Sequence, residues 1–411
     1  MRILWLTLAD PDPTTNGQFL YSSGLIRSVA PTSHQFDVIG LGRPGGGHYD
    51  GQTKDSVRWM LAKHRPRTRL RGLLSTLPFV SFRTTTADVQ ALVRNALNGP
   101  RPDAIVFDSI ALGWALPRVL ARWPDKADRP RLAYIAHNDE TGVAWALARA
   151  ERNPLKKLYK VYDAMRVARL ELTLARGVDL VTSNTQEDRR TFAERRDGRP
   201  VDFLPPGYDG RRLASRHIDA DTPRRAVILG SFQWAPKRRS LEEFLTTADP
   251  LFAKAGIELL IIGNASGVRP RQALQATRFI GFAADPDHIL SEARMALVLD
   301  RVGGFKLKVL DYVFKRLPIL SLLGSLPGVP LVHGDSAMMY PSDEALAKGV
   351  VDAMDDLELL NGIQDQAYRA CAARFDWPAI GQKLRDGLTG QREAGPRHAA
   401  FRDVVGVGGA S

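Results

Sequence analysis

The stretch Val302-Gly303-Gly304-Phe305-Lys306-Leu307-Lys308-Val309-Leu310-Asp311 lies between two short apolar runs, and this arrangement decides the fold. The run before it, residues 295–299, has the length and composition of a buried strand. The two glycines can bend the chain without a Cβ penalty, and apolar residues then recur at helical spacing. Pro318 ends that helix, and residues 319–322 form the next apolar run. The stretch therefore predicts a strand, a glycine turn, a helix that begins near Lys306, and a second strand.

The start of this predicted helix is suited to bind an anion, because the first backbone N–H groups of a helix have no partner within it. Lys308 and Asp311 are three residues apart, so they share one helix face. A cation for phosphate and a carboxylate for ribose hydroxyls are what a nucleoside diphosphate requires. An ordinary surface Lys–Asp pair would have the same spacing, and the stretch alone leaves both interpretations open.

Length and charge restrict the class of protein. The chain has 411 residues, which favours two domains, and its composition is that of a globular protein. Cys371 is the one cysteine of the sequence, so we expect a protein of the reducing cytoplasm. The formal net charge of +12 suggests nucleic acid, an anionic membrane surface or a phosphorylated substrate as partner. We disfavour nucleic acid, because we find no reading helix and no basic stretch interleaved with aromatic residues.

Both halves of the chain alternate predicted strands and helices, which is typical of α/β domains with parallel sheets. We predict a doubly wound, Rossmann-like domain over residues 1–208, a linker over residues 209–225, and a second such domain over residues 226–390. Its last helix could pack back on the first domain. Residues 391–411 are predicted to be a disordered tail. Two such domains would face each other across a cleft.

Candidate site residues follow the predicted strands, where open α/β sheets bind their ligands. In the first half, Asn16 and Gly17 precede the first helix, and His137 and Asn138 follow a buried strand. In the second half the corresponding residues are Ser231, Lys237, Gly263 and Gly281. Turn glycines, a structural histidine and a solvated lysine are the simpler interpretations of the same positions. Asp10 and Asp12 lack further ligands nearby, so we predict no metal site.

Two basic regions also carry apolar side chains. Residues 54–74 mix lysines and arginines with leucines and a tryptophan, and residues 154–175 form a long basic helix. We expect Leu158, Val161, Met165 and Leu172 to face the core from this helix. A solvated basic face is the common meaning of such regions, and attachment to an anionic membrane surface is the alternative.

Taken in order, these motifs resemble the GT-B glycosyltransferases of family 4, which use nucleotide sugars. The resemblance spans nearly the whole chain and includes Asn16-Gly17, the segment 136–140, the segment 177–184, Pro205-Pro206-Gly207, Gly230-Ser231-Phe232 and residues 303–311. It departs from the family at Gly303, where an acid is usual, and at Asp311, which replaces a glutamate.

The resemblance implies roles for individual residues. His137 and Lys308 would be catalytic, and Asn16, Gly17 and Asn138 would bind the acceptor. Nucleotide-sugar contacts would come from Ser231, Lys237, Gly263, Gly281, Gly303, Gly304, Phe305, Lys306 and Asp311.

The implied reaction moves a hexose from a UDP- or GDP-sugar to a hydroxyl group, with retention and without metal or cofactor, in glycan or glycoconjugate synthesis. The acceptor would be lipid-linked, a glycan or a protein, and the enzyme would be cytoplasmic, with attachment to the inner face of the membrane as a further hypothesis. A GT-B-like partner or scaffold without activity is the alternative, and a basic nucleic-acid-binding protein is the less favoured one.

Overall fold

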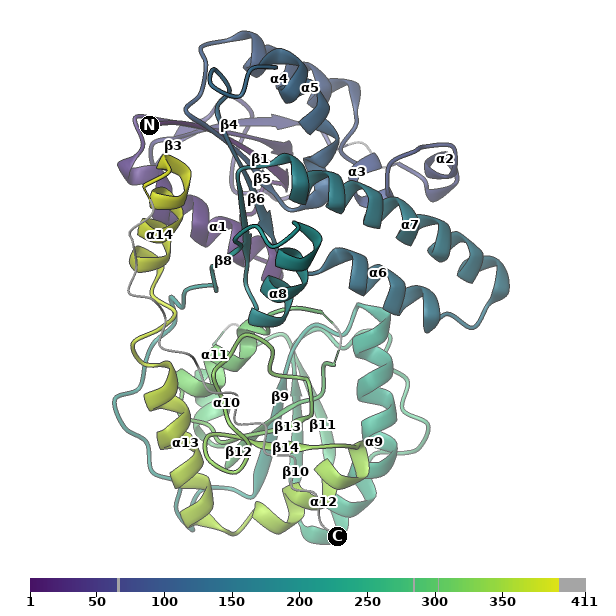
Figure 1. Ribbon diagram of the computed structural model, residues 1–411. Helices are drawn as coiled ribbons and strands as arrows, with labels where there is room; N and C mark the ends of the chain where they lie inside the picture. The colour runs from purple at the N-terminus through teal and green to yellow at the C-terminus, as the bar shows by residue number, and fades with distance from the viewer. Residues whose placement is uncertain (65–66, 284, 302, 392–411) are drawn as a thin grey trace, which may run out of the picture.

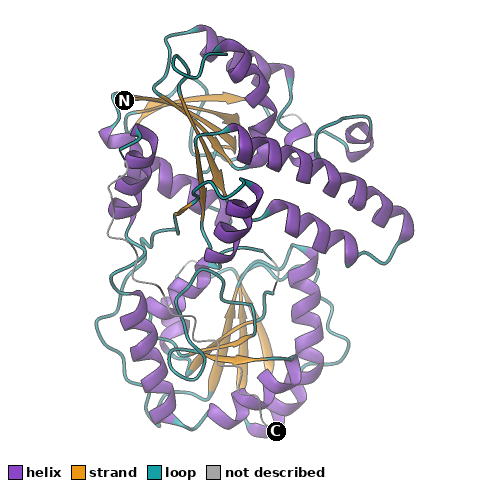
Figure 2. Ribbon diagram, in the orientation of Figure 1, coloured by secondary structure: helices purple, strands orange, loops and turns teal. Residues whose placement is uncertain are grey.

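The computed structural model describes residues 1–64, 67–283, 285–301 and 303–391. It contains two parallel sheets, each covered by helices, stacked one above the other in Figure 1. Figure 2 shows the same layers by secondary structure, with the strands of each sheet enclosed between helices. The predicted tail, residues 391–411, lies outside the described residues except for Gln391.

The first sheet is parallel apart from the short edge strand β3. Its spatial order is β3 (Thr53–Lys54), β4 (Val57–Ala62), β2 (Gln35–Leu41), β1 (Arg2–Ala9), β5 (Ala104–Asp108), β6 (Arg131–Ala136), β7 (Leu180–Ser183) and β8 (Asp202–Phe203). The helical segments around it are α1 (Gly17–Val29), η1 (Ala30–Thr32), α2 (Arg69–Leu73), α3 (Phe79–Phe82), α4 (Ala87–Asn98), η2 (Ile110–Ala115), α5 (Leu116–Arg122), α6 (Glu140–Arg149), α7 (Pro154–Gly177) and α8 (Gln186–Arg195).

The second sheet is parallel throughout its described strands. Its spatial order is β11 (Thr277–Gly281), β10 (Glu258–Ile262), β9 (Arg225–Leu229), β12 (Met295–Val298), β13 (Ile319–Leu322) and β14 (Met338–Tyr340). Its helices are α9 (Ala235–Ala255), α10 (Asp287–Ser291), α11 (Leu307–Phe314), α12 (Asp343–Ala353) and α13 (Leu357–Cys371).

Successive residues of each central strand enter different cores, because side chains of a strand alternate between the two faces of the sheet. In β1, Leu4 and Leu6 pack in one hydrophobic cluster, whereas Ile3 and Trp5 pack in the cluster on the opposite face. The strands are therefore apolar throughout, as expected for a parallel sheet covered on both sides. The predicted strand–turn–helix–strand unit is observed as β12, α11 and β13.

The segment 209–224 is irregular but packs against the second domain. Ile218 is fully buried in the core of that domain, and its N–H donates to Asn361 Oδ1 at 3.0 Å. The Arg216 guanidinium donates to the carbonyl of Ser291 at 2.9 Å. The segment is thus packed against the second domain through Arg216 and Ile218, while Asp209 at its start pairs with Arg27 of the first domain at 2.8 Å.

The two basic regions differ from the expectation. Within residues 54–74, Val57, Trp59 and Leu61 are buried in β4, because their alternation with Arg58 and Met60 is that of a half-buried strand. In α7 the predicted inward face was wrong for three of its four residues, because Leu158, Met165 and Leu172 are exposed. The helix instead buries Ala164, Val167, Leu170, Glu171 and Leu174, so its leucines lie on both faces.

The last helix, α14 (Trp377–Thr389), leaves the second domain and packs against α1 of the first (Figure 1). Trp377 anchors it between two glycines. A Cβ atom added at Gly24 would lie 2.1 Å from the six-membered ring of the Trp377 indole, and one added at Gly207 would lie 2.4 Å from its five-membered ring. The absence of side chains at both positions lets the indole enter the core.

We predict that Gly24→Ala lowers the melting temperature, because overpacking a filled core costs about 1–3 kcal/mol. Trp377→Phe removes the ring that the new methyl group would meet, so Gly24→Ala should cost less in that background. Gly362→Ala is the matched control: it lies within helix α13 with open space at its Cβ position and should be neutral or stabilising. Thermal unfolding followed by circular dichroism measures the four variants and the wild type, and equal stability of Gly24→Ala and Gly362→Ala would contradict this packing.

Candidate functional site

Three lysines surround one buried carboxylate where the second sheet meets α11. Asp300 follows β12, and its side chain is 3% exposed. Its Oδ2 atom lies 2.7 Å from Lys308 Nζ and 3.9 Å from Lys237 Nζ. Burial alone would raise the pKa of Asp300, but the charges of Lys308, Lys237 and Lys306 outweigh it and lower that pKa to about 2. The carboxylate therefore stays ionised and partly neutralises the lysine cluster formed by residues 237, 306 and 308.

Lys306 is the N-cap residue of α11 and is also buried, with its Nζ donating to the Gly303 carbonyl at 2.7 Å. Burial lowers the pKa of Lys306 to about 8; Asp300 and, to a smaller extent, Asp188 oppose this shift, whereas Lys237 and Lys308 add to it. Burial likewise lowers the pKa of Lys237. Three cations balanced by one carboxylate leave an excess of positive charge at the start of a helix, which is a favourable place for an anion.

Glycine turns extend this site along the ends of β9, β10 and β11. The Gly230 N–H donates to the Ile262 carbonyl at 3.0 Å, and the Gly263 N–H donates to the Gly281 carbonyl at 2.7 Å. Gly263 has a φ of +114°, and a Cβ there would lie 2.2 Å from the Gly230 oxygen. A Cβ at Gly230 would lie 3.9 Å from Lys308 Nζ, so these turns adjoin the lysine cluster. Ser231 directly follows Gly230 in the chain and is exposed.

The glycine turn at residues 303–304 touches the first domain. The Gly304 N–H donates to Asn138 Oδ1 at 2.8 Å, and Asn138 Nδ2 donates to Glu140 Oε1 at 3.0 Å. A Cβ at Gly304 would lie 2.7 Å from Asn138 Oδ1 and 3.0 Å from the His137 carbonyl. In this structure the Asn138 side chain therefore joins the two domains. The acceptor contact that the resemblance implies for Asn138 stays a prediction.

The His137 ring contacts Asp108, which ends the neighbouring strand β5 and is itself hydrogen-bonded by Trp5 of β1. Its Nε2 lies 2.6 Å from Asp108 Oδ1, and Trp5 Nε1 donates to Asp108 Oδ2 at 3.0 Å. Burial opposes ionisation of Asp108, but His137, Trp5 and Ser22 outweigh it and lower its pKa. Because Asp108 engages Nε2, Nδ1 is the ring nitrogen that can meet a substrate hydroxyl. This arrangement fixes the orientation of the imidazole.

A cavity of 110 Å³ lies between the domains at this point. It is lined by Gly17, Gln18, Tyr21, His137, Asn138, Asn184, Pro206, Phe305 and Leu307. The Asn16 side chain caps α1 by accepting from the Phe19 N–H at 3.0 Å, so it already has a structural role. A Cβ at Gly17 would lie 3.3 Å from Leu307 Cδ1, which brings the first helix against α11. The structure thus gathers His137, Asn138, Gly17 and Phe305 around one cavity.

Asp311 lies one turn further along α11 and has different neighbours from Lys308. It is partly buried beside Tyr208, and burial raises the pKa of Asp311 to about 6, while Tyr208 and Lys315 oppose the shift. Lys308 pairs with Asp300 rather than with Asp311. The surface Lys–Asp pair that the spacing allowed is therefore not what the structure contains.

The part of the chain that the structure describes has no group of three or more histidine, cysteine, aspartate or glutamate residues suited to hold a metal ion. The Asp10 carboxylate instead binds His48, in the loop that follows β2. Its Oδ1 lies 2.9 Å from His48 Nδ1, and its Oδ2 accepts from the His48 N–H at 3.0 Å.

Sequence reasoning missed Asp300, Asp108 and Asn184. Each follows or ends a buried strand, which was the signal used for His137. Asn184 Nδ2 donates to the His137 carbonyl at 2.8 Å and so fixes the backbone beside the glycine turn. For two of them the partner that makes the residue informative lies far away in the sequence, at 47 residues for Asn184 and 29 for Asp108.

Comparisons with known proteins agree with this geometry. Residues 223–356 match the family model described as Glycosyl transferases group 1. No curated protein sequence matches the chain. Among solved structures, HepE from Anabaena in complex with UDP matches with a TM-score of 0.62 at 14% identity, covering 95% of this chain and 100% of that one.

Two further structures match over similar lengths. Sucrose-phosphate synthase from Thermosynechococcus elongatus has a TM-score of 0.67 at 14% identity, covering 93% of this chain and 97% of that one. WaaG, a glycosyltransferase involved in lipopolysaccharide biosynthesis, has a TM-score of 0.63 at 15% identity, covering 94% and 100%. The predicted fold class is confirmed, because the chain has the two-domain GT-B fold of these proteins. The family model and the solved structures both support the prediction of a glycosyltransferase enzyme.

Proposed function

We propose that this protein transfers a hexose from a UDP- or GDP-sugar to a hydroxyl acceptor, in glycan or glycoconjugate synthesis. The observation that carries the proposal is the lysine cluster around Asp300, at the start of α11 and beside the glycine turns of β9 and β10. HepE, which has the same fold, has been solved with UDP and with UDP-glucose. Family 4 membership stays a prediction.

The lysine cluster would bind the diphosphate of the donor. Burial is the main cause of the lowered pKa of Lys306, and repulsion from Lys237 and Lys308 adds to it, while Asp300 opposes the shift. A diphosphate would supply the missing negative charge. The first N–H groups of α11 would add hydrogen bonds to it. Asp311 is assigned to the ribose hydroxyls, and Ser231, Gly263 and Gly281 to the nucleoside side.

The reaction would proceed without a metal ion. As the bond between the anomeric carbon and the phosphate oxygen breaks, negative charge grows on the leaving diphosphate. Lys308 and its neighbours would stabilise this charge more in the transition state than in the ground state. The acceptor oxygen forms the new bond to the anomeric carbon on the same face, which gives retention, and its proton passes to the departing phosphate oxygen. His137 would orient the acceptor or the sugar.

In the resemblance to family 4, Gly303 takes the place of an acid that would contact sugar hydroxyls, so those contacts would come from the backbone or from other residues. This position also motivates the alternative of a GT-B-like scaffold without activity. Transfer or slow hydrolysis of a nucleotide sugar by the purified protein separates the two functions, since a scaffold would do neither. Screening UDP- and GDP-sugars for thermal stabilisation identifies the donor.

The described residues include no helix long and apolar enough to cross a membrane. We propose a cytoplasmic enzyme that attaches reversibly to an anionic membrane surface. The basic residues at the start of α7 support this location, because each lysine or arginine near an anionic leaflet contributes about 1 kcal/mol.

Lys308→Ala should lower kcat about 100-fold, because charge-stabilising groups of this kind contribute roughly 3 kcal/mol to the transition state. Asp311→Asn should instead raise the KM for the donor and spare kcat, because a ribose contact is equal in both states. Lys348→Ala, at an exposed position of α12, is the control. Steady-state kinetics on folded variants checks this, and a wild-type rate in Lys308→Ala would remove the centre of the proposal.

Affinity for UDP should weaken about tenfold as the pH rises from 7 to 9. The pKa of Lys306 in the unliganded protein is lowered to about 8, so its ammonium is present below that pH and lost above it. Losing a charged hydrogen-bond donor costs about 1.5 kcal/mol or more. Isothermal titration calorimetry measures the change. Lys306→Gln should remove most of the pH dependence, whereas Lys348→Gln should keep it; an unchanged slope in Lys306→Gln would show that another group titrates.

Activity should survive chelation with EDTA, since Lys308, Lys306 and Lys237 can carry the charge of the diphosphate. The measurement compares initial rates of transfer in EDTA and in Mg²⁺ or Mn²⁺. Loss of transfer in EDTA with recovery by either ion would direct attention to the oxygen ligands of Asp10 and Asp12.

A further inference from the structure

Helix α7 exposes an apolar stripe. Leu155, Leu158, Tyr162 and Met165 recur at helical spacing on one face and are 79%, 69%, 38% and 50% exposed. A stripe of this kind normally packs against the core of a protein. The opposite face of α7 already does so, through Val167 and Leu174. Among the described residues, the stripe is therefore exposed on α7, apart from the Tyr162 ring, over which the Arg166 guanidinium lies at 4.3 Å.

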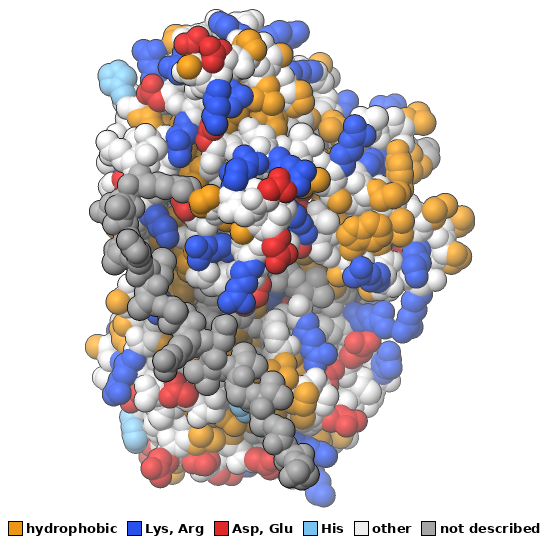
Figure 3. All heavy atoms as spheres, in the orientation of Figure 1, with side chains coloured by type: hydrophobic (Ala, Val, Ile, Leu, Met, Phe, Trp, Pro, Cys, Tyr) orange, Lys and Arg blue, Asp and Glu red, His pale blue; other side chains and the backbone are white. Residues whose placement is uncertain are grey.

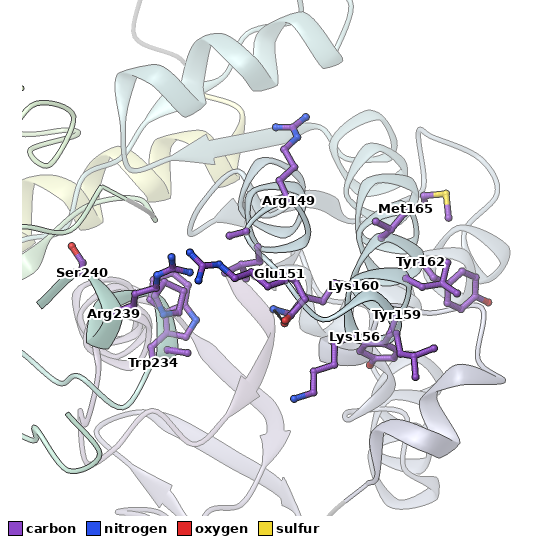
Figure 4. A pocket seen from close by; sticks show the side chains of 18 of the residues that line it. Arg149, Glu151, Lys156, Tyr159, Lys160, Tyr162, Met165, Trp234, Arg239 and Ser240 are labelled. Atoms are coloured by element: carbon purple, nitrogen blue, oxygen red, sulfur yellow. Dashed lines mark ion pairs between the residues drawn. The ribbon is translucent and has the colours of Figure 1, made fainter. Parts of the chain in front are cut away.

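This stripe forms one wall of a large groove of 1840 Å³. Trp234, Ala235 and Pro236, at the start of α9, form the facing wall. Figure 4 shows Trp234 and Arg239 on one side of the groove and Tyr159, Tyr162 and Met165 on the other. In Figure 3 the same side of the molecule, where α6 and α7 protrude, gathers hydrophobic side chains next to lysines and arginines. Pockets for small ligands measure roughly 300–1,000 Å³, so this groove can hold an elongated molecule.

The rim of the groove is positively charged. Its two acids are already neutralised: Glu151 pairs with Lys160 at 2.7 Å, and Glu243 pairs with Arg239 at 2.8 Å. Arg149, Arg152 and Lys156 also line the groove and are exposed, and no ion pair to them is found within the described ranges. The groove therefore combines apolar walls with an excess of cations at its rim. Such a surface is complementary to an anionic amphiphile.

The groove adjoins the candidate donor site. Trp234, Pro236, Ser240 and Glu243 line both the groove and a smaller cavity of 160 Å³. The smaller cavity is also lined by Lys237 and Asp300, which belong to the lysine cluster. A molecule lying along the groove would therefore end close to the diphosphate of the donor.

We propose that this groove binds the apolar chain of the acceptor, and that the acceptor is an anionic lipid whose charged group meets Arg149, Arg152 and Lys156. This inference rests on the proposed function and specifies its acceptor class. A free oligosaccharide would leave the stripe exposed to water, whereas an alkyl chain would cover it and remove apolar surface from water.

The test uses dodecyl phosphate below its critical micelle concentration as the probe, with inorganic phosphate as the control for the head group. Isothermal titration calorimetry should detect binding of dodecyl phosphate to the wild-type protein and at least tenfold weaker binding to Leu158→Gln/Met165→Gln and to Arg152→Gln/Lys156→Gln. Leu172→Gln is the matched control, because Leu172 is exposed on the same helix but does not line the groove. It should bind as the wild type does.

Affinity for UDP, measured on every variant, separates this inference from the proposed function. Wild-type protein that binds UDP but not dodecyl phosphate would overturn the groove assignment alone, as would unchanged binding in both double variants. Absence of UDP binding and of nucleotide-sugar hydrolysis would overturn the proposed function instead. Sedimentation with anionic vesicles distinguishes a surface contact from a single-lipid site. Loss of vesicle binding in the stripe variant with unchanged dodecyl phosphate binding would also overturn the assignment.

Discussion

The ion pair between Asp300 and Lys308 is the interaction on which the second domain's site depends. Three ammonium groups cannot gather in a buried place without a counter-charge, because removing charges from water costs several kcal/mol each. Asp300 supplies one negative charge and leaves the cluster short of balance. That imbalance gives the site its preference for an anion. Helix α11 begins beside this cluster, so its first N–H groups point to the same place as the lysines.

A second constraint joins the domains. Gly304 approaches Asn138 so closely that no side chain fits between them, and a Cβ at Gly328 would lie 2.9 Å from the Asn184 carbonyl. Both asparagines follow adjacent strands of the first sheet, β6 and β7. The glycines are therefore required by the contact between domains as well as by the turn. This contact brings the His137 backbone against the glycine turn that precedes α11, although the two belong to different domains.

Much of this arrangement could be predicted from local patterns. The unit formed by β12, α11 and β13 follows from two apolar runs, two glycines and Pro318, because each signal acts within a few residues. Asp300 and Asp108 were missed because a carboxylate at a strand end becomes informative only when its partner is known. The inward face of α7 was misassigned for a related reason. Leucines occupy both faces of that helix, so periodicity could not tell which face meets the core.

The apolar side chains that α7 exposes lose the stabilisation that burial would give them. Exposing Leu155 and Leu158 leaves each without the roughly 1.5–3 kcal/mol that full burial of such a side chain contributes, and the surrounding lysines keep the surface hydrated. The start of α9 meets this apolar surface through Trp234 and meets the lysine cluster through Lys237, three residues later. One helical turn thus separates a region suited to hydrocarbon from a region suited to phosphate. A transferase that joins a water-soluble donor to an amphipathic acceptor requires these two environments to be adjacent.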